Sequence, residues 1–182
     1  MRLSLLTAGV CWVTFGAMST EAQIISPPPA RHVAYVEAGG PGGFYSANYE
    51  RLVDETTSIR IGGTYWDLTN LDNVRERVRG VIVGAAKRYD ESVFFGQGPG
   101  RYVEVSGAFM LGEYQRERYG VSEVSGAYVS FAPQVGLRYE PAHGFLMRGM
   151  LTPLIPLVHR ASAFPEPRAA VFAGVSLGYV FR

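Results

Sequence analysis

The stretch RAAVFAGVSLGYVFR, residues 168–182, decides the fold class. Its odd-numbered positions from Val171 to Phe181 are all apolar, whereas most of the even-numbered positions between them are small. Alternation with a period of two predicts a β-strand, because successive side chains of a strand point to opposite faces. About eleven residues is long for a strand of an ordinary domain, where five or six are typical.

The same alternation recurs along most of the chain. Further strands are expected within residues 58–68, 101–114, 125–140 and 145–157. Residues 74–89 alternate less clearly, and which of their faces is the apolar one stays open. With the closing strand, six strands are expected from Ser58 onward. Because no stretch after the first residues shows a helical period, the sequence predicts an all-β fold built from antiparallel hairpins.

A glycine cluster at residues 39–43 lies in the stretch EAGGPGGFYSANYER, Glu37 to Arg51. Apolar positions are even-numbered before the cluster and odd-numbered after it. Glycine permits either a turn between two strands or a bulge within one long strand over residues 33–53. Single-chain bacterial barrels have even strand numbers, which favours the turn and a total of eight strands.

The face opposite the apolar one carries mainly Gly, Ser, Ala and Thr, with scattered charges, and only one lysine occurs in the chain. A soluble sheet would carry many more charges on its wet face. The pattern therefore predicts a single antiparallel up-and-down transmembrane β-barrel, with apolar side chains toward lipid. The alternative is a soluble periplasmic lipocalin-like barrel that binds an apolar ligand.

Aromatic residues lie near the expected strand ends, where a transmembrane barrel has its interfacial girdles. They are Tyr89, Tyr102, Tyr139, Phe145, Tyr179 and Phe181. Charged residues on the small-residue face should lie in the lumen. They are Glu37, Glu50, Arg60, Glu104, Arg138, Glu140 and Arg148. An unpaired charge there would be costly, so we expect these groups to pair across a lumen that eight strands leave barely wide enough for side chains.

The first residues have the features of a secretory signal peptide, expected at residues 1–22. Their apolar run is shorter than the roughly 20 residues that cross a bilayer. Residues 23–31 contain three consecutive prolines and are expected to form an extended N-terminal tether, so that residues 32–182 make up the barrel. The only cysteine, Cys11, lies in the signal segment, so no disulfide is expected in the mature chain.

The run from Val175 to Phe181 resembles the closing strand of bacterial outer-membrane proteins. That resemblance implies that Leu177, Tyr179 and Phe181 form the signal read by the barrel-insertion machinery, although Arg182 follows the terminal aromatic here. Residues 35–50 and 145–157 resemble a family of small, mostly uncharacterised outer-membrane β-barrel proteins common in Bacteroidetes. The resemblance implies a Gram-negative outer-membrane location, the fold and contact with outer-membrane lipid, but no established activity.

Signals for catalysis are weak, and we expect a structural or interaction role through the longer external loops, with no cofactor. His159 with Ser162 is the only local pair that would suit the alternative, a lipid-modifying enzyme of the deacylase or acyltransferase type. Three histidines and no mature cysteine give no metal cluster. A net charge of +1 argues against nucleic acid as a partner. Arginines in the run 75–79 could bind lipopolysaccharide phosphates, although a solvated strand end is the favoured interpretation.

Overall fold

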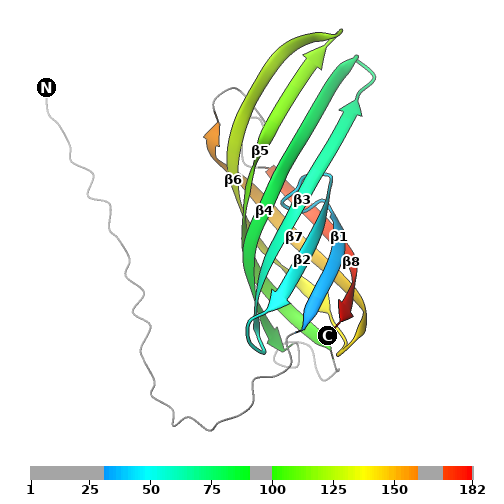
Figure 1. Ribbon diagram of the computed structural model, residues 1–182, viewed down its shortest axis with the longest axis vertical. Coiled ribbons are helices and arrows are strands. Elements are labelled where there is room, and N and C mark those ends of the chain that lie inside the picture. Colours follow the sequence, from blue (N-terminus) through cyan, green and yellow to red (C-terminus); the bar gives the residue numbers. More distant parts are fainter. Residues whose placement is uncertain (1–30, 91–99, 160–169, 182) are drawn as a thin grey trace, which may run out of the picture.

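The computed structural model describes residues 31–90, 100–159 and 170–181. They form one closed antiparallel barrel in which each strand pairs with its neighbours in sequence and β1 pairs with β8 (Figure 1). The strands are β1 (His32–Ala38), β2 (Tyr45–Leu52), β3 (Thr57–Thr69), β4 (Val74–Asp90), β5 (Arg101–Arg118), β6 (Val121–Tyr139), β7 (Gly144–His159) and β8 (Ala170–Phe181). The predicted up-and-down barrel of eight strands is confirmed. In these described ranges, no helix is long and apolar enough to cross a membrane.

The glycine cluster is the turn between β1 and β2, so the bulged single strand is excluded. Gly39 N–H donates to the Phe44 carbonyl at 3.0 Å, and Gly43 N–H donates to the Gly40 carbonyl at 2.9 Å. Gly39 and Gly43 have φ angles of 74° and 78°, a left-handed conformation that glycine adopts without steric cost. The outward positions change from even to odd across this turn, as the sequence pattern predicted.

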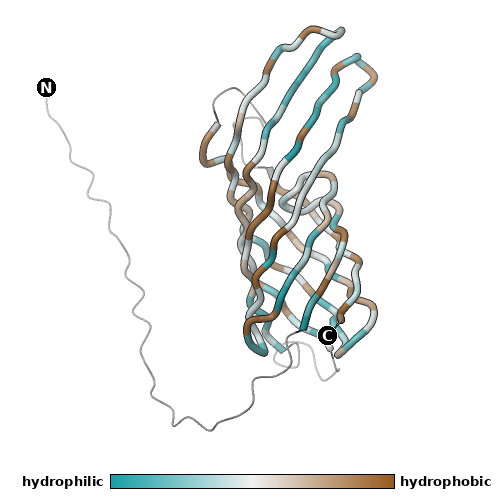
Figure 2. Tube along the Cα trace, in the orientation of Figure 1, coloured by the Kyte–Doolittle hydropathy of each residue, from teal (hydrophilic) through white to brown (hydrophobic). Residues whose placement is uncertain are grey.

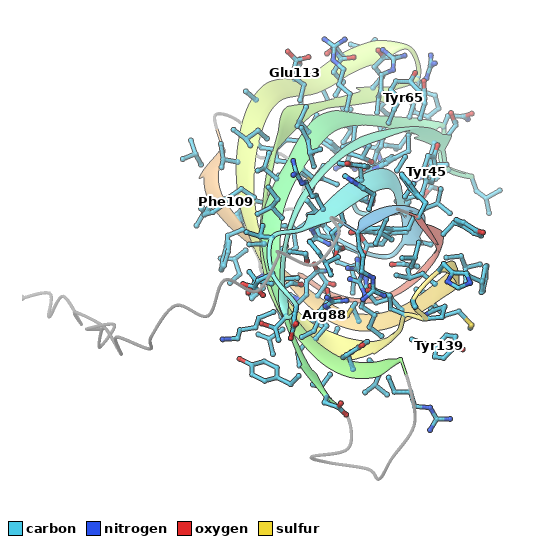
Figure 3. All side chains as sticks on the ribbon, turned by 60° about the horizontal axis from the view of Figure 1, so that its bottom comes forward. Tyr45, Tyr65, Arg88, Phe109, Glu113 and Tyr139 are labelled. Carbon is cyan, nitrogen blue, oxygen red and sulfur yellow. The ribbon has the colours of Figure 1, made fainter. Side chains whose placement is uncertain are left out.

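Apolar side chains cover the outside of the wall, and polar ones occupy much of the inside. Figure 3 shows Phe109 and Tyr139 pointing away from the barrel. On β4, whose parity the sequence left open, the buried positions are even-numbered and include Ile82 and Arg88. This inside-to-outside segregation is the one that a lipid-facing barrel requires.

The two ends of the barrel differ. We call the end where β1 begins and β8 finishes the terminal end, and the opposite one the hairpin end. Five of the six expected girdle aromatics are exposed around the terminal end: Tyr89, Tyr139, Phe145, Tyr179 and Phe181. The prediction for Tyr102 was wrong, because Tyr102 has inward parity and its ring lies 5.1 Å from the Arg88 guanidinium.

At the hairpin end, β3–β4 and β5–β6 project beyond the rest of the wall (Figure 1). β4, β5 and β6 have 17, 18 and 19 residues, whereas β1 and β2 have 7 and 8. We call the projecting residues 65–79 and 113–127 the hairpin extension. Only residues 70–73 and 119–120 connect its strands. These two external connections are therefore long hairpins with tight turns, as the charged segment Glu113 to Glu123 suggested for the second of them, and not irregular loops.

Hydrophilic residues are frequent along the strands of the hairpin extension (Figure 2), and several outward charges pair with one another. Arg75 and Arg77 bind Asp67 at 2.6 and 3.1 Å, and Arg79 binds Glu113 at 2.5 Å. Hydrogen bonds from Arg75 hold the pKa of Asp67 at about 2. Its inward residues Trp66, Val78 and Tyr114 belong to a buried apolar cluster that continues into the barrel. The other members of the cluster are Ile82, Ala108, Met110 and Tyr128. The extension therefore shares its apolar packing with the barrel interior.

The pairing of β6 with β7 is interrupted in the middle of the wall. Register pairs run from Tyr139 with Met147 to Val135 with Leu151, and then resume only at Phe131 with Ile155. Prolines occupy position 133 on β6 and position 153 on β7 within the interruption. Because proline has no N–H, it cannot donate to a ladder. The pairing of β6 with β7 is therefore missing over residues 132–134 and 152–154, and we call this interrupted stretch the seam.

Candidate functional site

The lumen contains a cluster of buried charged side chains. Four glutamates and four arginines among the described residues are each at most 4% exposed: Glu37, Glu50, Glu104, Glu140, Arg60, Arg88, Arg138 and Arg148. Their formal charges cancel, which is the arrangement that makes burial of so many ions tolerable. Seven of the eight are the residues that the sequence placed inside the barrel, and Arg88 joins them. We call these eight residues the lumen network.

Glu104 on β5 lies at the centre of the lumen network. One carboxylate oxygen accepts from Arg138 at 2.8 Å, and the other accepts from Arg148 at 3.0 Å. Arg138 also pairs with Glu50 on β2 at 2.8 Å. Three charge-assisted contacts thus join β2, β5, β6 and β7 across the barrel interior.

The network continues toward β1 and β3 through Arg148. Arg148 binds Glu37 at 2.8 Å, and its guanidinium lies 4.6 Å from the Tyr35 ring, within cation–π range. Glu37 is in turn 4.0 Å from Arg60. Arg60 donates to the Gln134 side chain, a polar inward residue of β6 that the sequence-based set did not include. These contacts bring the first three strands into the same connected group.

Glu140 closes the network at the terminal end. It follows the last residue of β6, and its carboxylate lies 2.6 Å from both Arg88 and Arg138. Arg31, which precedes β1 and is partly exposed, reaches the same carboxylate at 3.3 Å. Arg88 also donates to the Glu55 carbonyl in the β2–β3 turn at 2.9 Å. Glu140 is therefore a buried anion among three guanidinium groups, located where the lumen meets water.

The β1–β2 turn covers the lumen at the hairpin end. Its residues 40–43 are buried. The Gly42 carbonyl accepts from Thr64 Oγ1 at 3.0 Å and from Trp66 Nε1 at 3.2 Å, and the Phe44 ring packs edge-on against Trp66. A side chain at Gly40 would collide with the Glu37 carboxylate. The turn therefore rests directly on the lumen network. Its sequence predicted a turn but contained no signal for this inward position.

Arg88 escaped the sequence analysis because β4 carries apolar residues on both faces. Val81 and Val83 point outward, whereas Val78 and Ile82 point inward into the apolar cluster. Alternation identifies the inward face of a strand only when one face is polar, and neither face of β4 is polar along its middle. Arg88 could have been identified from the strand register, since it lies opposite Glu104 in the pairing of β4 with β5.

The proposed closing-strand residues form an outward row. Leu177, Tyr179 and Phe181 are exposed on β8. Phe181 is the register partner of His32, and the two rings stack at 5.7 Å. His32 Nδ1 also lies 2.5 Å from the Tyr49 hydroxyl. These contacts join the last strand to the first two at the terminal end.

Other sequence-based expectations fall outside the described residues. These are Ser162 and the His159 side chain, the signal peptide at residues 1–22, the tether apart from Arg31, and Arg182. The enzyme hypothesis built on His159 and Ser162 is therefore not tested by the structure. Within the described part of the chain, no three His, Cys, Asp or Glu side chains gather in a way that could hold a metal ion.

Comparison with known proteins supports the fold. No family model matches the sequence, and no curated protein matches it. The chain is similar in structure to the N-terminal β-barrel domain of Pseudomonas aeruginosa OprF, with 12% identity and a TM-score of 0.53 over 84% of this chain and 96% of that one. It is also similar to Neisserial surface protein A, with 8% identity and a TM-score of 0.50 over 83% and 92% of the two chains. At these identities the likeness shows the barrel fold alone.

Proposed function

We propose that this protein is an integral outer-membrane β-barrel of a Gram-negative bacterium, with a plugged lumen and a structural or interaction role. The observation that carries the proposal is the segregation of side chains across the wall. Eight ions are buried inside, whereas large apolar residues such as Ile61, Leu151 and Val175 are exposed outside. A bilayer is the solvent in which that exterior is stable, and a closed barrel leaves no unpaired strand edge in it.

A soluble periplasmic barrel of the lipocalin type fits the structure less well. Such a barrel buries apolar residues around a ligand cavity and exposes polar ones. Here the middle of the lumen holds Glu104, Arg138 and Arg148 in direct contact. An apolar exterior extending around the barrel would also make a soluble protein prone to association.

The terminal end lies in the periplasm in this proposal, because an exported chain enters the membrane from that side. The insertion machinery is the expected partner during assembly, and Leu177, Tyr179 and Phe181 are the residues it would read. The resemblance of residues 35–50 and 145–157 to the small Bacteroidetes-type barrel family is the basis for proposing membership of that family.

The hairpin extension would then stand outside the cell and supply the interaction surface. Its arginines at positions 75, 77 and 79 already bind Asp67 and Glu113. Lipopolysaccharide phosphates would have to displace Asp67 and Glu113 from these arginines. The extension is therefore better suited to a partner that contacts the arginines and the carboxylates together.

Fractionation combined with electrophoresis tests the proposal. The protein should be recovered with the outer membrane and should migrate differently before and after heating, because a folded barrel resists the detergent. In planar bilayers it should show no stable conductance, since the lumen network and the β1–β2 turn fill the pore. Recovery in the aqueous fraction without detergent would overturn the membrane location. Steady channel currents would overturn the plugged lumen.

A further inference from the structure

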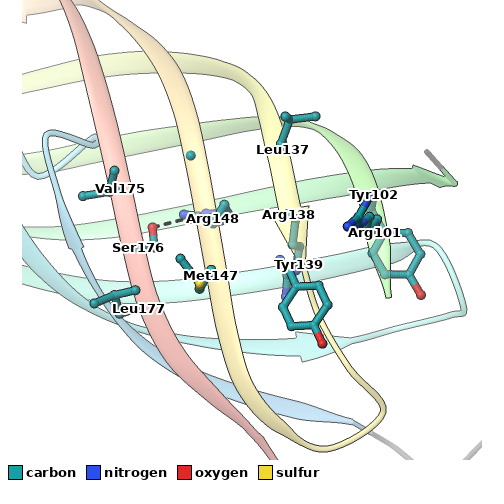
Figure 4. Close-up of a pocket in the computed structure, with 11 residues that line it drawn as sticks. Arg101, Tyr102, Leu137, Arg138, Tyr139, Met147, Arg148, Val175, Ser176 and Leu177 are labelled. Carbon is teal, nitrogen blue, oxygen red and sulfur yellow. Dashed lines mark hydrogen bonds between the residues drawn. The ribbon is translucent and has the colours of Figure 1, made fainter. Parts of the chain in front are cut away.

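An apolar hollow of about 390 Å³ lies on the outer wall over β6, β7 and β8 (Figure 4). The outward side chains along it are Leu137, Tyr139, Met147, Val175 and Leu177. Gly149 lies in the middle, and its register partners are Leu137 on β6 and Val175 on β8. A Cβ at Gly149 would meet no atom within 4 Å. The missing side chain thus leaves a gap one residue wide in an otherwise apolar surface.

A cation borders this hollow toward the terminal end. Arg101, the first residue of β5, is exposed, lines the hollow and pairs in register with Tyr139. Within the described ranges, no ion pair is formed by Arg101, unlike the arginines of the lumen network. A guanidinium presents a forked set of donors that matches phosphate oxygens. The apolar gap and the Arg101 guanidinium lie on one surface, in the same order as the acyl chain and the phosphate of a phospholipid.

We propose that this hollow is a binding site for one phospholipid of the membrane leaflet at the terminal end. An acyl chain lies over Gly149 between the Leu137 and Val175 side chains, and the phosphate binds Arg101. The inference rests on the proposed membrane location, because only then does lipid cover this wall. A lipid chain is the occupant that fits, since the hollow is mainly apolar and continuous with the rest of the lipid-facing surface.

Lipid retention by the purified barrel tests this site. The full chain in a neutral detergent is titrated with palmitoyl-oleoyl phosphatidylethanolamine, and bound lipid is counted by native mass spectrometry. One lipid per barrel is expected. Gly149→Phe should weaken binding by about tenfold, because its ring fills the space of several methylene groups. Gly63→Phe is the matched control, since Gly63 is another outward glycine, and a Cβ there would meet only the Gly80 carbonyl oxygen, at 3.8 Å.

The phosphate contact is tested separately. Arg101→Gln should weaken binding of the phospholipid but leave binding of a diacylglycerol with the same chains unchanged. Arg51→Gln, at an exposed position of β2 near the same end, should change neither. Equal losses in Gly149→Phe and Gly63→Phe would overturn the site. A dimer that disappears in Gly149→Phe while lipid binding is unaffected would assign the hollow to a second copy of the chain and would also overturn it.

The same samples separate failure of the site from failure of the proposed function. If the wild-type chain inserts into phospholipid vesicles and shows heat-dependent mobility but retains no lipid stoichiometrically, the binding site is wrong and the membrane location stands. If the chain stays in the aqueous phase and does not insert, the membrane location is wrong, and the lipid site is wrong with it.

Discussion

Arg138 on β6 and Arg148 on β7 are direct register partners, so two like charges face each other across neighbouring strands. The Glu104 carboxylate binds both of them, one with each oxygen. Like charges directly opposite each other destabilise a strand pair unless an anion compensates them. The same two strands lack continuous pairing around the prolines at 133 and 153. Glu104 therefore bridges β6 and β7 in the continuously paired stretch that borders this interruption.

Replacing Glu104 with glutamine should be strongly destabilising. The neutral amide would leave Arg138 and Arg148 facing each other with one positive charge in excess, and breaking a buried pair in this way typically costs about 3–5 kcal/mol. The measurement is the free energy of unfolding in detergent by urea titration, together with the temperature at which gel mobility changes.

Two further variants keep that test interpretable. Glu113→Gln removes an exposed ion pair with Arg79 and should change stability by no more than about 1 kcal/mol. Glu104→Gln combined with Arg148→Met restores equal numbers of positive and negative charges in the lumen network and should recover part of the loss. If the single and double variants are equally unstable, charge balance is not what Glu104 supplies.

The seam between β6 and β7 yields a second prediction. Gln134 Nε2 donates to Thr152 Oγ1 at 2.9 Å across the interrupted segment. Thr152→Val keeps the shape but removes the nearer of two acceptors of this buried amide and leaves the Glu37 carboxylate at 3.5 Å, which should cost about 1–3 kcal/mol. Hydrogen exchange of β7 amides should accelerate, whereas exchange of β3 amides should not. Thr69→Val, at an exposed position, is the control; equal acceleration in both variants would contradict a role for the Gln134–Thr152 bond.

Most of the fold could be predicted from the sequence because the wall has two chemically different faces. On β5, Val105, Phe109 and Leu111 alternate with Glu104, Ser106 and Ala108, and the structure keeps that division. β4 is the exception, since its inner face joins an apolar cluster and so resembles its outer face. Alternation reveals the orientation of a strand only when its two faces differ in polarity, and those of β4 differ little.

The candidate site could be predicted only as a set of inward charges. Parity places Glu37, Glu104 and Arg148 on the same side of the wall, but pairing depends on register and strand tilt, which link residues as far apart as Glu37 and Arg148. Neither the register nor the tilt can be deduced from the local sequence. The inward position of the β1–β2 turn escaped prediction for the same reason, because it depends on Thr64 and Trp66 of a different strand.

That turn gives a third prediction. Gly40→Ala places a methyl group against the Glu37 carboxylate, so either the turn or the ion pair of Glu37 with Arg148 must move. Overpacking of this kind costs about 1–3 kcal/mol. Displacement of the turn should also uncover the lumen, which bilayer recordings would detect as transient current steps. Gly63→Ala, which adds a methyl group on the outer wall, should be neutral in both measurements.

Asp67 in the hairpin extension gives a prediction for pH. Hydrogen bonds from Arg75, followed by those from Arg77, hold the pKa of Asp67 at about 2 in the folded protein, below the value of about 3.9 for an unperturbed aspartate. Because the folded pKa is the lower one, the stabilising contribution of ionised Asp67 is complete above about pH 4 and is lost as the pH falls through 2. A carboxyl-carbon NMR titration should place the midpoint near 2 in the wild type and raise it in Arg75→Gln.

Asp54 is an internal control for that titration. The pKa of Asp54 is also held at about 2, but by hydrogen bonds from the backbone N–H groups of Thr56 and Thr57 in the β2–β3 turn. Arg75→Gln removes no contact of Asp54, so its midpoint should stay where it is. An Asp67 midpoint that does not move in Arg75→Gln would mean that the ion pairs on the outer face of the extension are not formed in solution. Arg75 and Arg77 would then be free on the outer face, and lipopolysaccharide phosphates could bind them without displacing Asp67.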